Sequence, residues 1–157
     1  MANKMSTKPY KIIVGLEIHV HLATRTKMFC GCELAYGEAA NTRTCPVCIG
    51  MPGTLPVMNK TAVEYAILTA LALNCEIPSF TKWDRKSYYY PDLPKNYQIS
   101  QYDLPLSHDG VFAFDVVSPG SQTPSASKCI RIRRAHLEED TARNLSLIHI
   151  SEPTRPY

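Results

Sequence analysis

The residues with the clearest chemical potential are four cysteines that occur as two closely spaced pairs. One glycine separates Cys30 from Cys32, and twelve further residues precede the sequence Cys45-Pro-Val-Cys48. Two such pairs, set among glycine and proline residues that turn the chain, can close a tetrahedral zinc site with four thiolates. The alternative is a set of buried or incidental thiols, but the pairing and the turn residues favour a metal. Because four thiolates leave no open coordination position, we expect a structural role for the zinc.

Charged residues form a second group on two segments that are expected to be strands. On the first segment three polar side chains share one face: Glu17, His19 and His21. The second segment alternates in the same way and ends in two further acids: Arg134, His136, Glu138, Glu139 and Asp140. If both strands lie close together in one sheet, their carboxylates and imidazoles could bind Mg²⁺ together with nucleotide phosphate. A solvated surface explains each cluster equally well when it is considered alone.

A third group mixes cations with aromatic rings in the stretch that follows Trp83. Its members are Asp84, Arg85, Lys86, Tyr88, Tyr89, Tyr90, Lys95, Tyr97 and Gln98. Cations can contact phosphate and rings can stack on bases, so RNA binding is one interpretation. Composition alone favours the other, in which the rings pack inside a proline-stapled loop and the cations are solvated. The position of this group relative to the metal-binding residues would decide between the two.

The elements that position these residues are expected to form an α+β fold with a mainly antiparallel sheet and helices. Alternating apolar residues over 10–22 predict a half-buried strand. Residues 28–53 are predicted to form an excursion that is pinned by zinc. Apolar residues at helical spacing predict a helix over 60–73, with Asn59 as its N-cap.

The second half of the chain is expected to contain more strand than helix. Prolines within residues 83–105 exclude a long helix and indicate an ordered, irregular surface segment. Strands are predicted over 111–117 and 128–137, with residues 118–127 as a hairpin-like connection.

Composition narrows the class of protein. The chain has 157 residues, of which 45% are hydrophobic and 20% charged, as is ordinary for one soluble domain. The formal charge of +3 argues against a uniformly basic nucleic-acid-binding surface. The longest apolar stretch is too short to span a bilayer and the first residues lack a secretory signal, so we expect a cytoplasmic protein without membrane contact. In that reducing setting the two remaining cysteines, Cys75 and Cys129, are expected to be packed thiols.

Four longer segments carry a resemblance to a known family: VGLEIHVHL, MPGTLPVMNKTAVEYAILTALALN, DRKSYYYPDLPKNYQISQYDLP and RRAHLEED. In this order they resemble the B subunit of the heterotrimeric Asp/Glu-tRNA amidotransferase, from Tyr10 to about Asn144. The resemblance implies a cradle-like domain similar in fold to glutamine synthetase and the guanidino kinases. It also implies that ATP activates the side-chain carboxylate of misacylated Glu-tRNA(Gln) and/or Asp-tRNA(Asn) as an acyl phosphate. Ammonia then displaces the phosphate.

The resemblance further implies partners and site residues. An A subunit would supply ammonia through a channel, and a small C subunit would clasp the heterotrimer. The expected catalytic residues are also the implied Mg²⁺ ligands: Glu17, His19, Glu138 and Glu139. Arg134 and His136 would lie just outside these ligands. The motif that borders the pocket would bind substrate, phosphate or the tRNA acceptor end: Asp84, Arg85, Lys86 and Tyr88. Zinc at the four cysteines would brace the cradle, as it does in some members.

The resemblance also sets the expected domain limits. We expect a flexible N-terminus over 1–9, the N-terminal part of the catalytic cradle over 10–145, and a non-native tail over 146–157 that looks like translated cloning sequence. The helical and C-terminal tRNA-binding domains of the family would be absent, and the chain would be inactive by itself.

Two other hypotheses stay open beside the amidotransferase. The first is a zinc-braced RNA-binding module without catalysis, which explains the cysteines and the aromatic rings but not the two acidic segments. The second is a metal-binding scaffold without RNA or ATP. Nucleotide binding discriminates, because neither of these alternatives predicts it.

Overall fold

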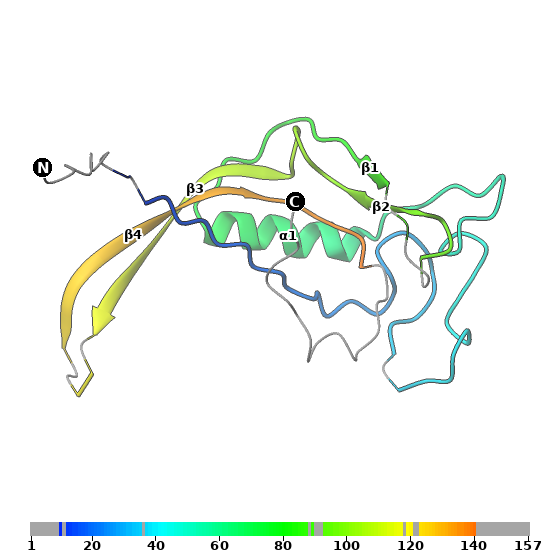
Figure 1. The fold of residues 1–157 in the computed structure, drawn as a ribbon, viewed down its shortest axis with the longest axis horizontal. Helices are drawn as coiled ribbons and strands as arrows, with labels where there is room; N and C mark the ends of the chain where they lie inside the picture. Colours follow the sequence, from blue (N-terminus) through cyan, green and yellow to red (C-terminus); the bar gives the residue numbers. More distant parts are fainter. Residues whose placement is uncertain are drawn as a thin grey trace, which may run out of the picture.

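The computed structural model describes residues 10, 12–35, 37–87, 89, 93–117, 119–120 and 123–140. These residues contain one helix and four strands, arranged as two antiparallel pairs. In chain order the elements are α1 (Lys60–Ala72), β1 (Asp84–Ser87), β2 (Tyr97–Ser100), β3 (Ser107–Val117) and β4 (Pro124–Ala135). Figure 1 shows α1 alongside the β3–β4 pair, with β1 and β2 beyond one end of the helix. The predicted α+β class with antiparallel strands is confirmed, whereas the cradle stays a prediction.

Helix α1 begins where the sequence predicted. Asn59 has an extended backbone, and its side-chain oxygen accepts a hydrogen bond from the N–H of Ala62, as an N-cap does. The amide nitrogen of Asn59 also donates to the hydroxyl of Thr26 at 2.9 Å. This second bond ties the start of the helix to the segment that leads into the cysteines.

The end of α1 packs against β3 through a glycine. A Cβ atom at Gly110 would overlap Cys75 Sγ and would lie 2.7 Å from the carbonyl oxygen of Leu73. Only a residue without a side chain permits this approach, and the N–H of Val111 donates to that same oxygen at 3.0 Å. Cys75 is buried here as predicted, whereas Cys129 is exposed on β4, so the prediction of a packed thiol was wrong for Cys129.

Strands β3 and β4 form a long hairpin. Their register runs from the pair Ser107 and Ala135 to the pair Val117 and Pro124, with one irregularity near the turn. Both strands were predicted, but β3 begins earlier and β4 begins nearer the turn than expected, so the connection is shorter than residues 118–127. Figure 1 shows the hairpin continuing past the end of α1, which leaves its outer part without a covering layer from the helix.

Strands β1 and β2 correct the prediction of an irregular segment over residues 83–105. They pair antiparallel, with Asp84 opposite Ser100 and Ser87 opposite Tyr97. The prolines exclude a long helix but not short strands, because Pro94 lies between the two strands and interrupts neither. The buried apolar side chains join this pair to the cysteine excursion, the helix and the last described segment: Phe29, Ala62, Ala70, Cys75, Leu93, Ile99, Leu106 and Leu137.

The predicted half-buried strand over residues 10–22 was wrong for the residues described. No strand is assigned within residues 12–22, and apolar residues of the alternating set are exposed, among them Leu16 at 81% and Ile18 at 80%. Figure 1 draws this segment, in dark blue, as a plain extended trace. Alternation specifies which side chains share a face, but a strand also needs a neighbouring backbone with which to form a ladder. Within the described residues, no neighbour forms such a ladder with this segment.

The helical content of the structure bears on the membrane expectation. Within the described ranges, no helix combines the length and the apolar character that crossing a bilayer requires.

Candidate functional site: a thiol cluster and an acidic segment

Four cysteine sulfur atoms meet at one point. The sulfurs of Cys30, Cys32, Cys45 and Cys48 all lie within 4.8 Å of one another, and each residue is half-buried. Zinc–sulfur bonds of about 2.3 Å in a tetrahedron set the sulfurs about 3.8 Å apart, which lies within this limit. The donor set and its geometry therefore fit zinc, as the spacing of the cysteines predicted.

Two tight local structures hold the cysteines in place. The first is a narrow antiparallel turn, in which the N–H of Lys27 donates to the carbonyl of Cys32 at 2.9 Å. In the second, the N–H of Cys45 donates to Cys48 Sγ at 3.1 Å, and the N–H of Ile49 donates to the carbonyl of Cys45 at 3.2 Å. Short-range hydrogen bonds thus preorganise each pair of thiols.

The thiols have unequal proton affinities. A hydrogen bond from the backbone N–H of Cys48 lowers the pKa of the Cys45 thiol to about 7. Burial, reinforced by hydrogen bonds with Cys45 and Cys30, raises the pKa of Cys32 to about 12, and burial also raises the pKa of Cys30. Several adjacent thiolates repel one another, and a divalent cation between them would relieve that repulsion.

A lysine that sequence reasoning missed also faces the cluster. Lys27 Nζ donates to the carbonyl of Arg43 at 2.7 Å and lies 3.8 Å from Cys48 Sγ. Arg43 in turn pairs with Glu33 at 2.6 Å and Glu38 at 3.3 Å, which links the two halves of the excursion. A single lysine shortly before the first cysteine pair forms no recognisable pattern, so only the fold reveals its place.

The last described segment, residues 136–140, docks against β2. The N–H of Glu139 donates to the carbonyl of Ile99 at 2.8 Å, and the Gln98 side chain donates to the carbonyl of Glu139 at 2.7 Å. These contacts place the predicted acidic residues beside the β1–β2 pair, which carries the predicted substrate-binding residues. We call residues 136–140 the acidic segment below.

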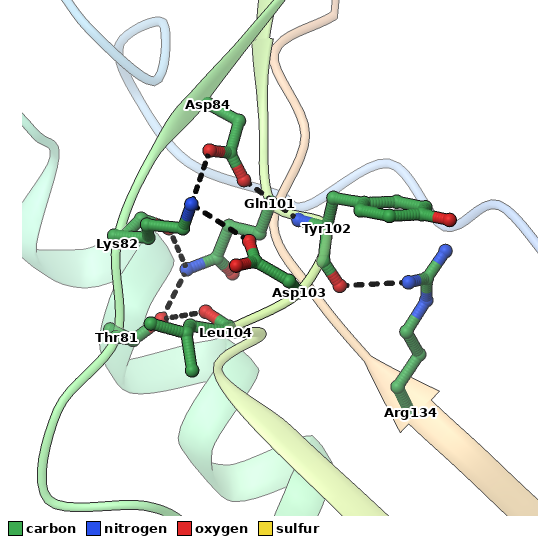
Figure 2. A network of polar contacts seen from close by, with 8 residues as sticks. All are labelled: Thr81, Lys82, Asp84, Gln101, Tyr102, Asp103, Leu104 and Arg134. Atoms are coloured by element: carbon green, nitrogen blue, oxygen red, sulfur yellow. Dashed lines mark hydrogen bonds and ion pairs between the residues drawn. The ribbon is translucent and has the colours of Figure 1, made fainter.

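A buried amide fixes where the acidic segment begins. Gln101 is only 2% exposed, and its side-chain oxygen accepts from the N–H of Leu106 at 3.2 Å and from that of Leu137 at 3.1 Å. Its nitrogen donates to the Thr81 hydroxyl at 2.7 Å and to the carbonyl of Lys82 at 3.2 Å. Figure 2 shows the bonds from this nitrogen at the centre of the network. Both donors and both acceptor positions of the buried amide are therefore satisfied.

Asp84 belongs to the same network. Lys82 Nζ lies 3.0 Å from Asp84 Oδ1 and 2.8 Å from Asp103 Oδ1, and the other Asp84 oxygen accepts from the N–H of Tyr102 (Figure 2). The hydrogen bond from Lys82 lowers the pKa of Asp103, and the two carboxylates raise the pKa of Lys82. The structure thus gives Asp84, predicted to bind substrate, a set of protein partners at the start of β1.

The structure brings the two predicted acidic clusters together. His21 Nε2 lies 3.6 Å from Asp140 Oδ2, so the segment around residue 19 runs beside the acidic segment. Burial lowers the pKa of His136, and the charges of Glu138 and Glu17 oppose that shift. Within the N-terminal segment, His19 Nε2 lies 3.3 Å from Glu17 Oε1. His21 and Asp140 are thus neighbours although more than a hundred positions separate them in the chain.

The two glutamates of the acidic segment have different partners. Glu138 is partly exposed, and its Oε1 lies 3.7 Å from Lys86 Nζ. Glu139 is nearly buried and pairs with Lys95 through Oε1, while Oε2 accepts from the N–H of Ile99 at 3.1 Å. Among the described residues, the four cysteines alone gather three or more ligand atoms as closely as a preformed metal site requires. The acids therefore lie near one another without forming a closed cage.

The remaining predicted site residues lie on or beside β1. The guanidinium of Arg85 stacks over the ring of Tyr97 with 4.7 Å to its centroid, and Lys86 reaches Glu138 from the same strand. Tyr88, the last predicted substrate-binding residue, lies outside the described residues. The aromatic-basic group thus borders the acidic segment, and its role in binding RNA or substrate stays a prediction.

Comparison with known proteins gives the same result as the motifs. A family model described as the GatB/GatE catalytic domain matches residues 12–154. The chain belongs to this family. Among its curated relatives, the B subunit of the aspartyl/glutamyl-tRNA(Asn/Gln) amidotransferase of Rhodopirellula baltica is 53% identical over 87% of this chain. The proteins of the same name from Thermomicrobium roseum and Ruminiclostridium cellulolyticum are 55% and 56% identical over 89% and 84% of it.

The match covers only part of each GatB/GatE family relative. The chain spans 27% of the length of the first two relatives and 26% of the third. Membership of the GatB/GatE catalytic domain family is therefore shown for this part of the protein. The reaction, substrates and partners of the whole protein are proposals.

Proposed function

We propose that this chain contributes the phosphotransfer centre of an ATP-dependent tRNA amidotransferase. The reaction converts Glu-tRNA(Gln) and/or Asp-tRNA(Asn) to the amidated aminoacyl-tRNA. The substrate carboxylate attacks the γ-phosphorus of ATP and ADP leaves. Ammonia from an A subunit then attacks the acyl carbon and phosphate leaves, while a C subunit holds the assembly together.

One observation carries this proposal: the N-terminal motif and the acidic segment meet. The contact between His21 and Asp140 supports it, because it joins an imidazole of the first motif to a carboxylate of the second, and the charges of Glu138 and Glu17 both oppose the lowered pKa of His136. A solvated strand face would explain either motif alone, but it gives no reason for the two to converge. Phosphoryl transfer needs such a convergence, because its catalysis rests on positioning and charge neutralisation.

The converging side chains suit Mg²⁺ in a substrate-dependent site. Mg²⁺ keeps several waters and binds through one or two carboxylates plus substrate phosphates, so a closed protein cage is not needed. None of Glu17, His19 and Glu138 is buried, so their polar atoms are accessible to a metal ion. Glu139 was predicted as a fourth ligand, and binding Mg²⁺ would require it to share the carboxylate with Lys95. When bound, Mg²⁺ would offset phosphate charge during transfer.

The strand beside the acids supplies cations for the other substrate. Arg85 and Lys86 are exposed on β1, and the Tyr97 ring holds the Arg85 guanidinium in place. A guanidinium in a fixed orientation suits phosphate, so we assign both cations to ATP phosphate or the acceptor end of misacylated tRNA. Asp84 acts from the start of the same strand, where it orients Lys82.

An amidation assay tests the proposal. The natural full-length reading frame, assembled with A and C subunits, is supplied with misacylated tRNA, ATP and glutamine. We expect Glu138→Gln to lower amide formation by about 100-fold or more, as loss of charge stabilisation does, while glutamine hydrolysis continues. Glu76→Gln is the matched control, because Glu76 is exposed on another segment.

Two outcomes would contradict the proposal. Normal amidation by the Glu138→Gln protein would move the phosphotransfer site elsewhere. Persistent misacylated-tRNA binding in an assembly that shows no ATP-dependent activation of a small carboxylate analogue would favour the zinc-braced RNA-binding module. The exposed Arg85–Tyr97 and Arg134–Tyr102 stacks are the surfaces that such a module would use.

A further inference from the structure

We propose that Lys95 is a positioning residue that couples the thiol cluster to the acidic segment. The inference rests on the proposed function only for the importance of the acidic segment, because the coupling itself is structural. It assigns a physical path by which a metal at the cysteines would stabilise the site where phosphate is transferred. The path runs from Cys48 through Gly50 to Lys95 and then to Glu139.

The first step joins the cysteine turn to Lys95. The N–H of Gly50 donates to the carbonyl of Val47 at 3.1 Å, and that of Met51 donates to Pro46 at 2.9 Å, so Gly50 belongs to the turn that carries Cys45 and Cys48. Its backbone has a φ of +73°, in the left-handed region that favours glycine. The side of Gly50 that would carry a Cβ faces Lys95: an added Cβ would overlap Lys95 Cβ and lie 3.3 Å from its Cα.

The second step joins Lys95 to Glu139. The side chain of Lys95 is only 5% exposed and that of Glu139 only 12%, and the two form an ion pair. The ammonium also lies 5.1 Å from the centroid of the Tyr97 ring. A pair removed from water in this way depends on well-fixed geometry, and the loss of one partner leaves an uncompensated charge. If the cysteine turn loosened and displaced the Lys95 backbone, the ion pair with Glu139 would therefore be weakened.

The third step joins Glu139 to the strand pair. The carboxylate oxygen of Glu139 that does not pair with Lys95 accepts a hydrogen bond from the N–H of Ile99. The N–H of Glu139 donates to the carbonyl of Ile99. Glu138, which precedes it, reaches Lys86 on β1. Thus the orientation of Glu139 sets the position of the acidic segment on β2. Glu138 and Asp140, its neighbours in the segment, are positioned by the same contacts.

Coupling of this kind is reciprocal and can be measured without catalysis. Zinc at the cysteines should protect the amides of Ile99 and Glu139 from hydrogen exchange, because the hydrogen bonds of both amides depend on Glu139. We expect removal of zinc from the 157-residue chain by a chelator to speed their exchange by about 5- to 150-fold, the usual span of coupling between sites. Amides of the β3–β4 hairpin, such as that of Phe112, serve as the internal reference and should change little.

Three variants test the path itself. Lys95→Met should show fast exchange at Ile99 and Glu139 even with zinc bound, and chelation should add little more. Gly50→Ala retains all four sulfurs and should bind zinc, yet it should show part of the same loss of protection. Lys86→Met is the matched control, because Lys86 pairs with Glu138 rather than Glu139. In this variant the amides of Ile99 and Glu139 should respond to chelation as they do in the unmodified chain.

Specific outcomes overturn the inference. Unchanged exchange at Ile99 and Glu139 after zinc removal would show that the cluster and the segment are independent. Equal acceleration in the β3–β4 hairpin would show that zinc stabilises the whole fold and not this path. A full chelation response in Lys95→Met would assign the coupling to another contact. Each result is obtained from exchange rates and metal content, so failure of the coupling is distinguishable from failure of the proposed amidation.

Discussion

The thiol cluster and the acidic segment differ in how the chain builds them. The cluster draws its four ligands from nineteen consecutive positions, and hydrogen bonds within two tight turns place the sulfurs. The acidic site draws on the two ends of the described chain, and its position depends on contacts with β1 and β2. One site is closed before a metal arrives, whereas under the proposed function the other is a set of carboxylates near one another that substrate phosphate would complete.

The two sites also differ in the charged partners of their ligand side chains. At the cysteines, thiolates repel one another and the ammonium of Lys27 lies against the cluster. In the acidic segment, each glutamate already faces its own lysine. The cluster is therefore expected to respond strongly to metal and pH, and the acidic segment to changes in its neighbours.

Loss of one thiol should give the largest effect. Replacement Cys48→Ser removes a metal ligand and the sulfur acceptor for the Cys45 N–H, so we expect zinc affinity to fall by more than about 100-fold, beyond the loss that outer-shell changes cause. Zinc content after dialysis against a chelator buffer measures this. Cys129→Ser, at an exposed thiol on β4, should bind zinc normally; a similar loss there would contradict a site limited to the four cysteines.

The pH dependence of zinc binding sharpens the same contrast. Burial raises the pKa of Cys30 and that of Cys32, the latter to about 12, so both thiols are protonated in the free cluster at neutral pH. The bound state needs thiolates and holds fewer protons, so affinity must rise with pH. Release of these two protons alone corresponds to about 100-fold tighter binding per pH unit, and the partly protonated thiol of Cys45 adds to this slope near pH 7. Competition with a chromogenic chelator between about pH 7 and 8 would show this slope, and a flat profile would contradict it.

Lys27 should have a smaller effect on the same site. Its ammonium offsets part of the negative charge of a four-thiolate centre, so Lys27→Met should speed zinc release by about 10- to 100-fold, as loss of an outer-shell partner does. Release is followed with an excess of chelator. Lys60→Met, at an exposed lysine on α1 that pairs with Glu64, is the control, and equal rates in the two variants would remove Lys27 from the account.

His136 should give the smallest effect, and it concerns the acidic side. Burial lowers the pKa of His136 in the folded protein, so below the ordinary pKa of about 6.5 the unfolded chain binds more protons than the folded one. The free energy of unfolding should therefore decrease as pH falls below that value. In His136→Gln this part of the slope should disappear, and urea unfolding at about pH 5.5 and 7.5 would measure it. An unchanged slope would assign the pH dependence to other groups.

Much of the local structure was predictable from the sequence because the determinants are local. Asn59 caps α1 within its own turn, and the Cys-Pro-Val-Cys sequence makes the turn that places two ligands. The β3–β4 hairpin also follows from alternation on both sides of one connection. For these elements a short window of sequence contains the groups that define the cap, the turn and the strand pairing.

The failures have the opposite cause, because they concern groups whose partners are distant in the chain. Residues 12–22 alternate like a strand, yet without a ladder in the described structure they stay extended and exposed. Gln101 and Lys27 carry no pattern, and Lys95 was noted only as one cation of the aromatic-basic group. The roles of all three come from hydrogen-bond and ion-pair partners that only packing brings near. From the sequence, the proximity of Glu17 to the acidic segment could be stated only as a condition for Mg²⁺ binding and not as a prediction.

The measurement that tests the central claim most directly is a Mg²⁺ titration of amidation by the Glu17→Gln protein in the full-length assembly. If Glu17 and the acidic segment together hold Mg²⁺ at the transferred phosphate, the variant should need a higher Mg²⁺ concentration for half-maximal amidation, by about 10-fold or more. Its glutamine hydrolysis should be unchanged. The same half-maximal Mg²⁺ concentration in the variant and the unmodified protein would contradict the assignment of this site to phosphoryl transfer.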